Sequence, residues 1–173
     1  MNARIPVRRL VPADASAYRQ LMLAAYAQTP DAFTSTVAER ESLPLSWWES
    51  RMQDKPCANE AVFGGFSNGV LAGAAGLMRE TRERTRHKAT LFGMVVDPAY
   101  RRSGLGRALV NAVLQHARTC AGLRVVQLTV TEGNAGAQRL YAENGFEVFG
   151  TEPMATTTTT GFASKVHMWR EIS

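Results

Sequence analysis

Residues 91–118 read LFGMVVDPAYRRSGLGRALVNAVLQHAR. The apolar run at 91–96 predicts a buried strand, which ends at Asp97-Pro98 because proline cannot donate to a ladder of backbone hydrogen bonds. Apolar residues then recur at helical spacing from Leu105 onward, which indicates a helix that begins at or just after Gly104. The stretch therefore predicts a strand, a turn and a helix, with two glycines at the first turn of the helix.

The junction between this turn and the helix has the chemistry of an anion site. The first N–H groups of a helix have no internal partner and carry a partial positive charge, so phosphate is a natural ligand there. Gly104 and Gly106 let a ligand approach the backbone. Arg101, Arg102 and Arg107 add positive charge, and arginine can hold phosphate oxygens through two parallel hydrogen bonds. The junction predicts a pyrophosphate site; an ordinary glycine-containing turn is the alternative.

Two common nucleotide motifs are absent, because there is no GxxxxGK[ST] and because Gly104 and Gly106 alone do not complete GxGxxG. The order Arg101, Gly104, Gly106, preceded by Val-Asp-Pro and followed by an amphipathic helix, resembles the coenzyme A loop of the GNAT N-acetyltransferase superfamily. The resemblance implies that acetyl-CoA is a cosubstrate. It implies that the pyrophosphate is bound by Arg101, Arg102, Ser103, Gly104, Leu105, Gly106 and Arg107, and that the pantetheine arm pairs with Met94, Val95 and Val96.

A second motif supports the same resemblance. A buried strand ending at Val130 is followed by Asn134, by Tyr141 and then by Asn-Gly-Phe at 144–146. Two helical turns separate Asn134 from Tyr141, so both can line one groove. In this family the asparagine contacts the pantetheine or phosphate arm, and the tyrosine lies beside the thioester sulfur. The resemblance implies that Asn134 binds the cosubstrate and that Tyr141 is a general acid; a half-buried structural tyrosine is the alternative.

The residue that removes the proton of the acceptor amine is not evident. Many members of the family have a glutamate in the fourth strand, but here Thr90 stands near that place and residues 91–96 contain no acid. The candidates are Glu80, Glu83, His87 and Glu132. A dedicated base is not required, since positioning alone contributes several kcal/mol to catalysis.

The remaining patterns predict an α/β (α+β mixed sheet) GNAT fold with about six or seven strands, about four flanking helices, and strands four and five parallel. Asn68-Gly69 between two apolar runs predicts a hairpin with a type I′ turn. Strands at 146–150 and 165–172 suit a final hairpin with residues 151–163 as its long loop. Within that loop Thr156 to Thr160 have high β propensity, so an extended hairpin and a mobile loop are both open.

Size and composition limit the function classes. A chain of 173 residues suits one domain, so residues 1–173 are expected to form a single GNAT N-acetyltransferase domain. No apolar run approaches the roughly 20 residues of a membrane span, and the N-terminus lacks the apolar core of a signal peptide, which predicts a cytoplasmic protein without a membrane partner. Cys57 and Cys120 are expected to be reduced thiols, and the spacing of the cysteines and histidines predicts no metal site.

The net charge of +5 raises the question of nucleic acid. Much of the basic charge lies in the run RETRERTRHK at 79–88, which has no interleaved aromatic residues and accompanies no DNA-binding motif. A solvated hairpin turn is therefore the favoured interpretation, and no nucleic-acid partner is expected.

The predicted function is direct transfer of the acetyl group of acetyl-CoA to a primary amine of a small molecule, peptide or protein. Phe33, Trp47 and Trp48 are candidates to line the acceptor pocket. A non-catalytic acyl-CoA-binding regulatory module and a basic nucleic-acid-binding protein are the alternatives. The acceptor and the oligomeric state, with a homodimer as one option, stay open.

Overall fold

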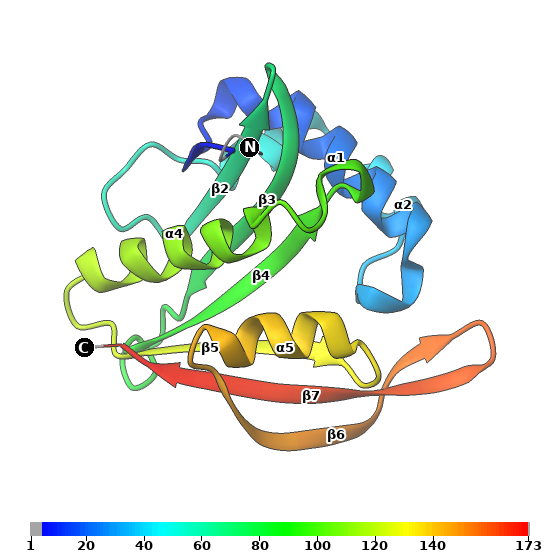
Figure 1. Cartoon of the computed structure of the whole chain (residues 1–173). Helices are drawn as coiled ribbons and strands as arrows, with labels where there is room; N and C mark the ends of the chain where they lie inside the picture. The colour runs from blue at the N-terminus through cyan, green and yellow to red at the C-terminus, as the bar shows by residue number, and fades with distance from the viewer. Residues whose placement is uncertain (1–4, 173) are drawn as a thin grey trace.

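The computed structural model describes residues 5–172 as a seven-stranded mixed sheet with helices on both faces (Figure 1). The strands are β1 (Val7–Arg9), β2 (Glu60–Ser67), β3 (Val70–Arg79), β4 (Lys88–Val96), β5 (Val125–Thr131), β6 (Glu147–Thr158) and β7 (Gly161–Glu171). The helices are α1 (Ala15–Gln28), α2 (Val37–Glu41), α3 (Leu45–Ser50), α4 (Leu105–Thr119) and α5 (Ala135–Glu143). The sheet order is β1-β2-β3-β4-β5-β7-β6, and β4 and β5 are parallel as predicted.

The first four strands form an antiparallel meander, which contains the predicted hairpin at Asn68-Gly69. Asn68 and Gly69 connect β2 to β3 with φ angles of 50° and 78°, as a type I′ turn requires. The basic run continues from the end of β3 as an exposed turn over residues 80–87, which leads into β4.

The C-terminal hairpin is longer than predicted. β7 lies between β5 and β6, so the last strand is not at the edge of the sheet. The expected loop at 151–163 is wrong, because Thr156, Thr157 and Thr158 pair with residues 163, 162 and 161 and the chain turns only at 159–160. β-branched threonines fit a pleated ladder well, which favours the extended hairpin over a mobile loop.

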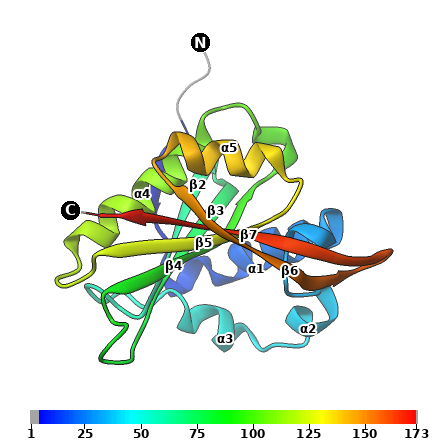
Figure 2. The same ribbon diagram turned by 90° about the horizontal axis from the view of Figure 1, so that it is seen from below.

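Two apolar layers hold the sheet between the helices (Figure 2). α1 and α3 cover one face, where Tyr18, Met22 and Trp48 are buried together. α4 covers the other face with one fully buried stripe: Leu105, Leu109, Val110, Val113, Leu114 and Ala117. Burial of each large side chain in that stripe contributes roughly 1.5–3 kcal/mol, and this is what fixes the start of α4 against the sheet. None of the helices within residues 5–172 has the length and apolarity needed to cross a bilayer.

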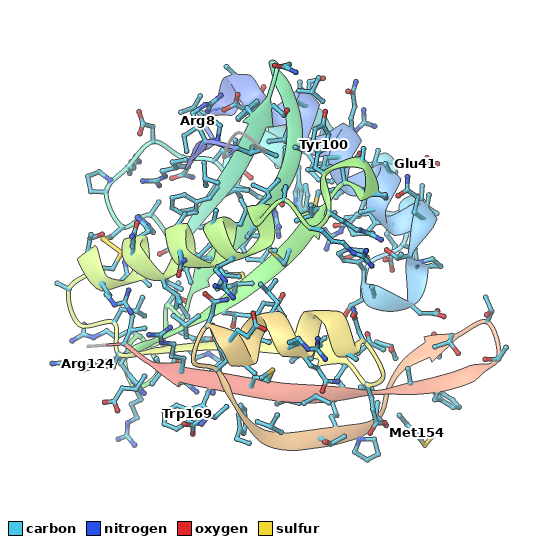
Figure 3. The ribbon with its side chains drawn as sticks, in the orientation of Figure 1. Arg8, Glu41, Tyr100, Arg124, Met154 and Trp169 are labelled. Carbon is cyan, nitrogen blue, oxygen red and sulfur yellow. A yellow bond between two sulfur atoms is a disulfide. The ribbon has the colours of Figure 1, made fainter. Side chains whose placement is uncertain are left out.

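The two cysteines form a disulfide, so the expectation of reduced thiols is wrong (Figure 3). Cys57 lies in the segment between α3 and β2, and Cys120 caps the C-terminal end of α4. Their Cα atoms are 5.4 Å apart although 63 residues separate them along the chain. The bond joins the helix that follows the glycine loop to the segment that enters β2.

Candidate active site

The site begins with a bulge in β4. Ala74 pairs with Val95 and Gly76 with Phe92, so Gly93 and Met94 together face one residue of β3. Gly93 has a φ of +58°, which favours glycine over any residue with a side chain. A bulge adds twist and bends its strand, so β4 leaves β5 at this point. β4 and β5 pair only from Lys88 to Thr90 and are not paired beyond it.

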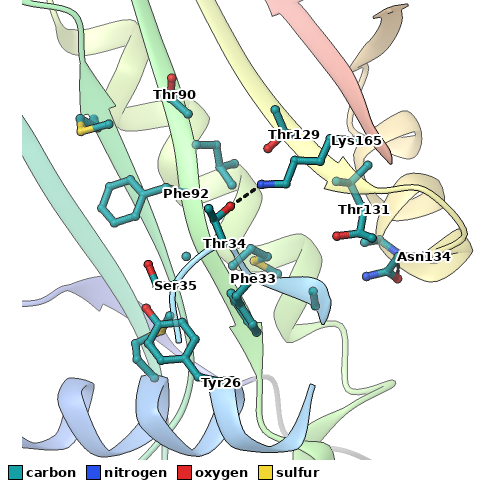
Figure 4. Close-up of a pocket in the computed structure, with 18 of the residues that line it drawn as sticks. Tyr26, Phe33, Thr34, Ser35, Thr90, Phe92, Thr129, Thr131, Asn134 and Lys165 are labelled. Carbon is teal, nitrogen blue, oxygen red and sulfur yellow. Dashed lines mark hydrogen bonds between the residues drawn. The ribbon is translucent and has the colours of Figure 1, made fainter. Parts of the chain in front are cut away.

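The divergence of the two parallel strands opens a cavity of about 330 Å³ (Figure 4). Thr90 to Met94 line it from β4, and Thr129 to Thr131 line it from β5. Tyr18, Met22 and Tyr26 of α1 line it on one side, and Asn134, Leu140 and Tyr141 line it on the other. The cavity therefore passes between the strands, from the layer of α1 to the layer of α5.

The glycine loop at residues 101–107 leaves most of its backbone amides free. The amide of Arg101 donates to Pro98 O at 3.4 Å, and that of Leu105 donates to Ser103 Oγ at 3.3 Å. Within the described chain, the other five loop amides have no protein acceptor: those of Arg102, Ser103, Gly104, Gly106 and Arg107. Arg102 and Gly104 have φ angles of +61° and +82°, and such left-handed residues turn successive N–H groups toward a common side. The loop thus has several backbone N–H groups that can donate to an anion.

The side chains of the loop take different roles. Leu105 is buried in the core, so it can offer a ligand only its backbone. Arg107 donates to Glu143 of α5 at 2.7 Å, which ties the start of α4 to α5. Gly106 permits close packing at the same junction, because a Cβ there would lie 3.3 Å from the side chains of both Leu140 and Met94. Arg101 and Arg102 are exposed beside the free amides.

Asn134 and Tyr141 lie on the cavity side of α5. Asn134 caps α5, since its side-chain oxygen accepts from Ala137 N at 3.2 Å, and it also lines the cavity. The Tyr141 ring is buried against Phe146, and its hydroxyl has no hydrogen-bond partner among the described residues. Burial raises the pKa of Tyr141 above its ordinary value, so the phenol keeps its proton. The structure therefore brings a protonated phenol to the cavity.

None of the four candidate bases lines the cavity. Glu80, Glu83, His87 and Glu132 are all exposed, and the lining, as far as the described chain forms it, contains no aspartate, glutamate or histidine. No group of three or more metal-binding side chains is found within residues 5–172.

Of the three aromatic candidates for the acceptor pocket, only Phe33 lines the cavity. Trp48 is buried in the core against Tyr18. Trp47 stacks near two arginines, Arg40 and Arg51, which line the cavity together with Lys165. The sequence reasoning missed Gly93, Arg40, Arg51 and Lys165. A glycine within an apolar strand is a bulge signal and identifies Gly93, whereas the three cations carry no local signal.

The model of the acetyltransferase (GNAT) family matches residues 22–146, which is most of the chain. The chain belongs to this family. L-amino acid N-acetyltransferase AaaT of Escherichia coli is 29% identical over 104 residues, which are 60% of this chain and 62% of the relative. The matched part thus spans less than two thirds of that relative.

Solved structures of GNAT proteins have the same fold over nearly the whole chain. A GNAT acetyltransferase from Streptococcus pneumoniae superimposes with a TM-score of 0.86 and 26% identity, covering 97% of this chain and 99% of its own. YncA of Salmonella typhimurium, solved with its cofactor acetyl-CoA, has a TM-score of 0.81 and 23% identity, covering 99% of this chain and 95% of its own. The seven-stranded sheet is therefore the GNAT fold.

Proposed function

We propose that this protein is an N-acetyltransferase that transfers the acetyl group of acetyl-CoA directly to a primary amine. The observation that carries the proposal is that three features adjoin one another: the unpaired edges of β4 and β5, the buried phenol of Tyr141, and the loop with five free amides. The first two line the cavity, and Gly106 of the loop lies next to Met94 and Leu140, which line it as well. Both cysteines are held in a disulfide and neither lines the cavity, so no thiol is placed to carry the acetyl group.

The residues of this chain fit acetyl-CoA. Five unpartnered amides at a helix N-terminus, flanked by Arg101 and Arg102, match a pyrophosphate in charge and in hydrogen-bond donors. A Cβ at Gly104 would meet no protein atom within 4 Å, so the space above this residue is open to a ligand. Met94, Val95 and Val96 are not paired to β5 and can pair with an extended pantetheine arm, as a further strand does. Asn134 lines the cavity beside this path.

The chemistry requires a donor at two places. Acetyl-CoA supplies the acetyl group: the amine nitrogen bonds to the carbonyl carbon, and the carbon–sulfur bond breaks with its electron pair on sulfur. The bulge at Gly93 and Met94 lies outside the ladders with β3 and β5, so its N–H groups are placed to donate to the carbonyl oxygen as negative charge develops there. Tyr141 donates its proton to the departing sulfur and regains one from solvent. The surplus proton on nitrogen leaves to water.

The test is to incubate the protein with acetyl-CoA and a panel of primary amines and to follow the release of free thiol. Turnover that depends on an amine supports the proposal. Saturable binding of acetyl-CoA without turnover on any amine would indicate a regulatory acyl-CoA-binding module instead.

The assignment of the glycine loop can be tested by substitution. We expect Gly104→Val to raise the dissociation constant for acetyl-CoA by at least about 10-fold. Gly104 has a φ of +82°, where a β-branched residue is strained, and its open side is the side offered to the ligand. The matched control is Gly69→Val, because Gly69 has a φ of +78° and equally open surroundings in the remote β2–β3 turn. Calorimetric titration measures both; unaltered affinity in Gly104→Val contradicts the assignment of the loop.

We also propose that residues 1–173 act as one GNAT domain, because both apolar layers pack on a single sheet. The predicted cytoplasmic location stays a prediction. A lasting disulfide is characteristic of oxidising compartments, so the redox state of Cys57 and Cys120 in the cell tests that location.

A further inference from the structure

Three basic side chains line the cavity. Arg40, Arg51 and Lys165 all contribute to the lining, and no carboxylate does so within the part of the chain that the structure describes. These residues come from α2, from the end of α3 and from β7, so three separate elements bring cations to one space. A cluster of this kind is unfavourable unless an anion joins it, because like charges repel and partial burial weakens their hydration.

Arg51 is held in a fixed orientation. Its guanidinium lies 4.4 Å from the ring centroid of Trp47 and 4.9 Å from that of Phe92. Its Nε is 3.4 Å from Glu60, which faces it from β2 and does not line the cavity. The Arg51 side chain is only 19% exposed. Stacking on two rings restricts the guanidinium plane, which is how arginine is prepared to bind a planar anion.

Arg40 also lies over the indole ring of Trp47 and has no acidic partner among the described residues. Its guanidinium lies 4.7 Å from the Trp47 ring centroid, and its Nη2 donates to Ser35 at 2.7 Å. Its Nε is buried without a hydrogen-bond partner. No carboxylate of the described chain lies within 4 Å of this guanidinium. Tyr26 lies near both arginines: burial raises the pKa of its phenol, and the two guanidiniums oppose that rise.

Lys165 completes the cluster from the opposite strand. Figure 4 shows its side chain extending from β7 toward Thr34, whose hydroxyl it contacts. Thr34 belongs to the segment after α1 that also carries Phe33 and Ser35. Glu60 is thus the one carboxylate within 4 Å of any of these three cations in the described chain, and the cluster keeps a net positive charge.

We propose that the acceptor is an aminocarboxylate whose carboxylate binds to Arg40 and Arg51, with its apolar part against the cavity's aromatic and methionine side chains. This inference rests on the proposed N-acetyltransferase function. Arginine forks match carboxylates through two parallel hydrogen bonds. Phe92 stacks on Arg51 and directly precedes Gly93, so a carboxylate at Arg51 sets a nearby amine beside the β4 bulge.

The same charges act on the amine itself. Nearby cations lower the pKa of an ammonium group, so they increase the fraction of free amine, the form that attacks the thioester. This effect suits a cavity whose lining, over the described residues, includes no carboxylate or imidazole to act as a base. It also disfavours polyamines and other acceptors that carry several positive charges.

The experiment compares matched acceptors on the wild-type protein with saturating acetyl-CoA. The set is L-phenylalanine, L-methionine and L-leucine, each beside its carboxamide and its decarboxylated amine, with spermidine as a cationic acceptor. We expect kcat/KM to be at least about 100-fold higher for the carboxylate, because the analogues bring no anion to the two partly buried arginines. The carboxamides have the more acidic ammonium groups and present more free amine, which biases the comparison against this result.

Two variants locate the carboxylate. Arg40→Gln and Arg51→Gln are each expected to lower the preference for carboxylate over carboxamide by at least about 10-fold, through KM for the acceptor and not through KM for acetyl-CoA. Arg84→Gln removes the same charge from the exposed β3–β4 turn and is expected to leave the preference unchanged. Arg51→Gln loses the contacts to Trp47, Phe92 and Glu60 and can fail to fold. In that case Arg40→Gln and the wild-type comparison still test the carboxylate site.

The outcomes separate this inference from the proposed function. If the decarboxylated amines, the carboxamides or spermidine are turned over as well as the amino acids or better, the carboxylate site is wrong. The proposed N-acetyltransferase function would still hold in that case. An unchanged preference in a folded Arg40→Gln protein overturns the assignment of the carboxylate to that residue. No turnover on any amine overturns both.

Discussion

Replacing Tyr141 by phenylalanine is expected to lower kcat by about 10²–10⁴-fold while leaving the affinity for acetyl-CoA within about threefold of wild type. The substitution removes only the hydroxyl, and the ring keeps its packing against Phe146. The hydroxyl has no hydrogen-bond partner among the described residues, so no protein group loses a partner in the variant. The expected fall in kcat therefore reflects the missing proton donor to the departing sulfur.

Steady-state kinetics and calorimetric titration of acetyl-CoA measure the two halves of this prediction. Tyr100→Phe is the control, because Tyr100 lies in the turn before the glycine loop and does not line the cavity. Retention of most of the wild-type kcat by Tyr141→Phe would show that the thiolate leaves without this acid.

Tyr141 also sets the expected pH dependence. Burial raises the pKa of the phenol above its ordinary value near 10, so the acid stays protonated throughout the neutral and moderately alkaline range. On the acid side the rate is expected to fall as the amine becomes ammonium. A pH profile of kcat/KM is therefore expected to rise with pH and to hold its plateau up to about pH 10. A decline beginning near neutral pH would indicate a different acid.

The local parts of the fold follow from the sequence. Gly104 and the apolar period after it mark the start of α4, and the structure places the helix at Leu105–Thr119. Asn68-Gly69 marks the first hairpin, and Asn134 marks the start of α5. Each of these features depends on a few neighbouring residues, through a positive φ or a helix cap. The local sequence is therefore sufficient to predict it.

The features that were missed depend on contacts between distant segments. The position of β7 between β5 and β6 is decided by which edges of the sheet remain unpaired, and residues 161–171 do not encode it locally. Arg40, Arg51 and Lys165 meet only because α2, α3 and β7 converge on one cavity. In the sequence each is an ordinary basic residue of the kind that usually lies in solvent.

Gly93 is an intermediate case between these two kinds. A glycine in the middle of an apolar strand indicates a bulge, but the pattern does not show that β4 leaves β5 at that residue. The structure shows the parallel pairing ending at Thr90 and the bulge following within three residues. The opening between the strands is the geometric basis of the proposed site: Tyr141 lines it, and Gly106 of the glycine loop lies next to Met94 and Leu140, which also line it.

The disulfide gives the largest expected effect on stability. Reduction of the bond, or the double substitution Cys57→Ala with Cys120→Ala, is expected to lower the free energy of unfolding by about 4 kcal/mol. The bond closes a long loop in the unfolded chain, with a sequence separation of 63 residues, and chain-entropy reasoning gives roughly this value. For a domain of this size the change corresponds to a fall in Tm of roughly 8–16 °C.

Thermal unfolding with and without a reductant tests this. Wild-type protein is expected to lose stability on addition of the reductant, whereas the double alanine variant, which has no bond to reduce, is expected to show the same Tm in both buffers. The variant also lacks the buried Cys120 side chain, so comparison of reduced wild type with the variant separates lost packing from the lost cross-link. A wild-type Tm that does not change in reductant, with the reduction verified by thiol titration, contradicts a stabilising role for the bond.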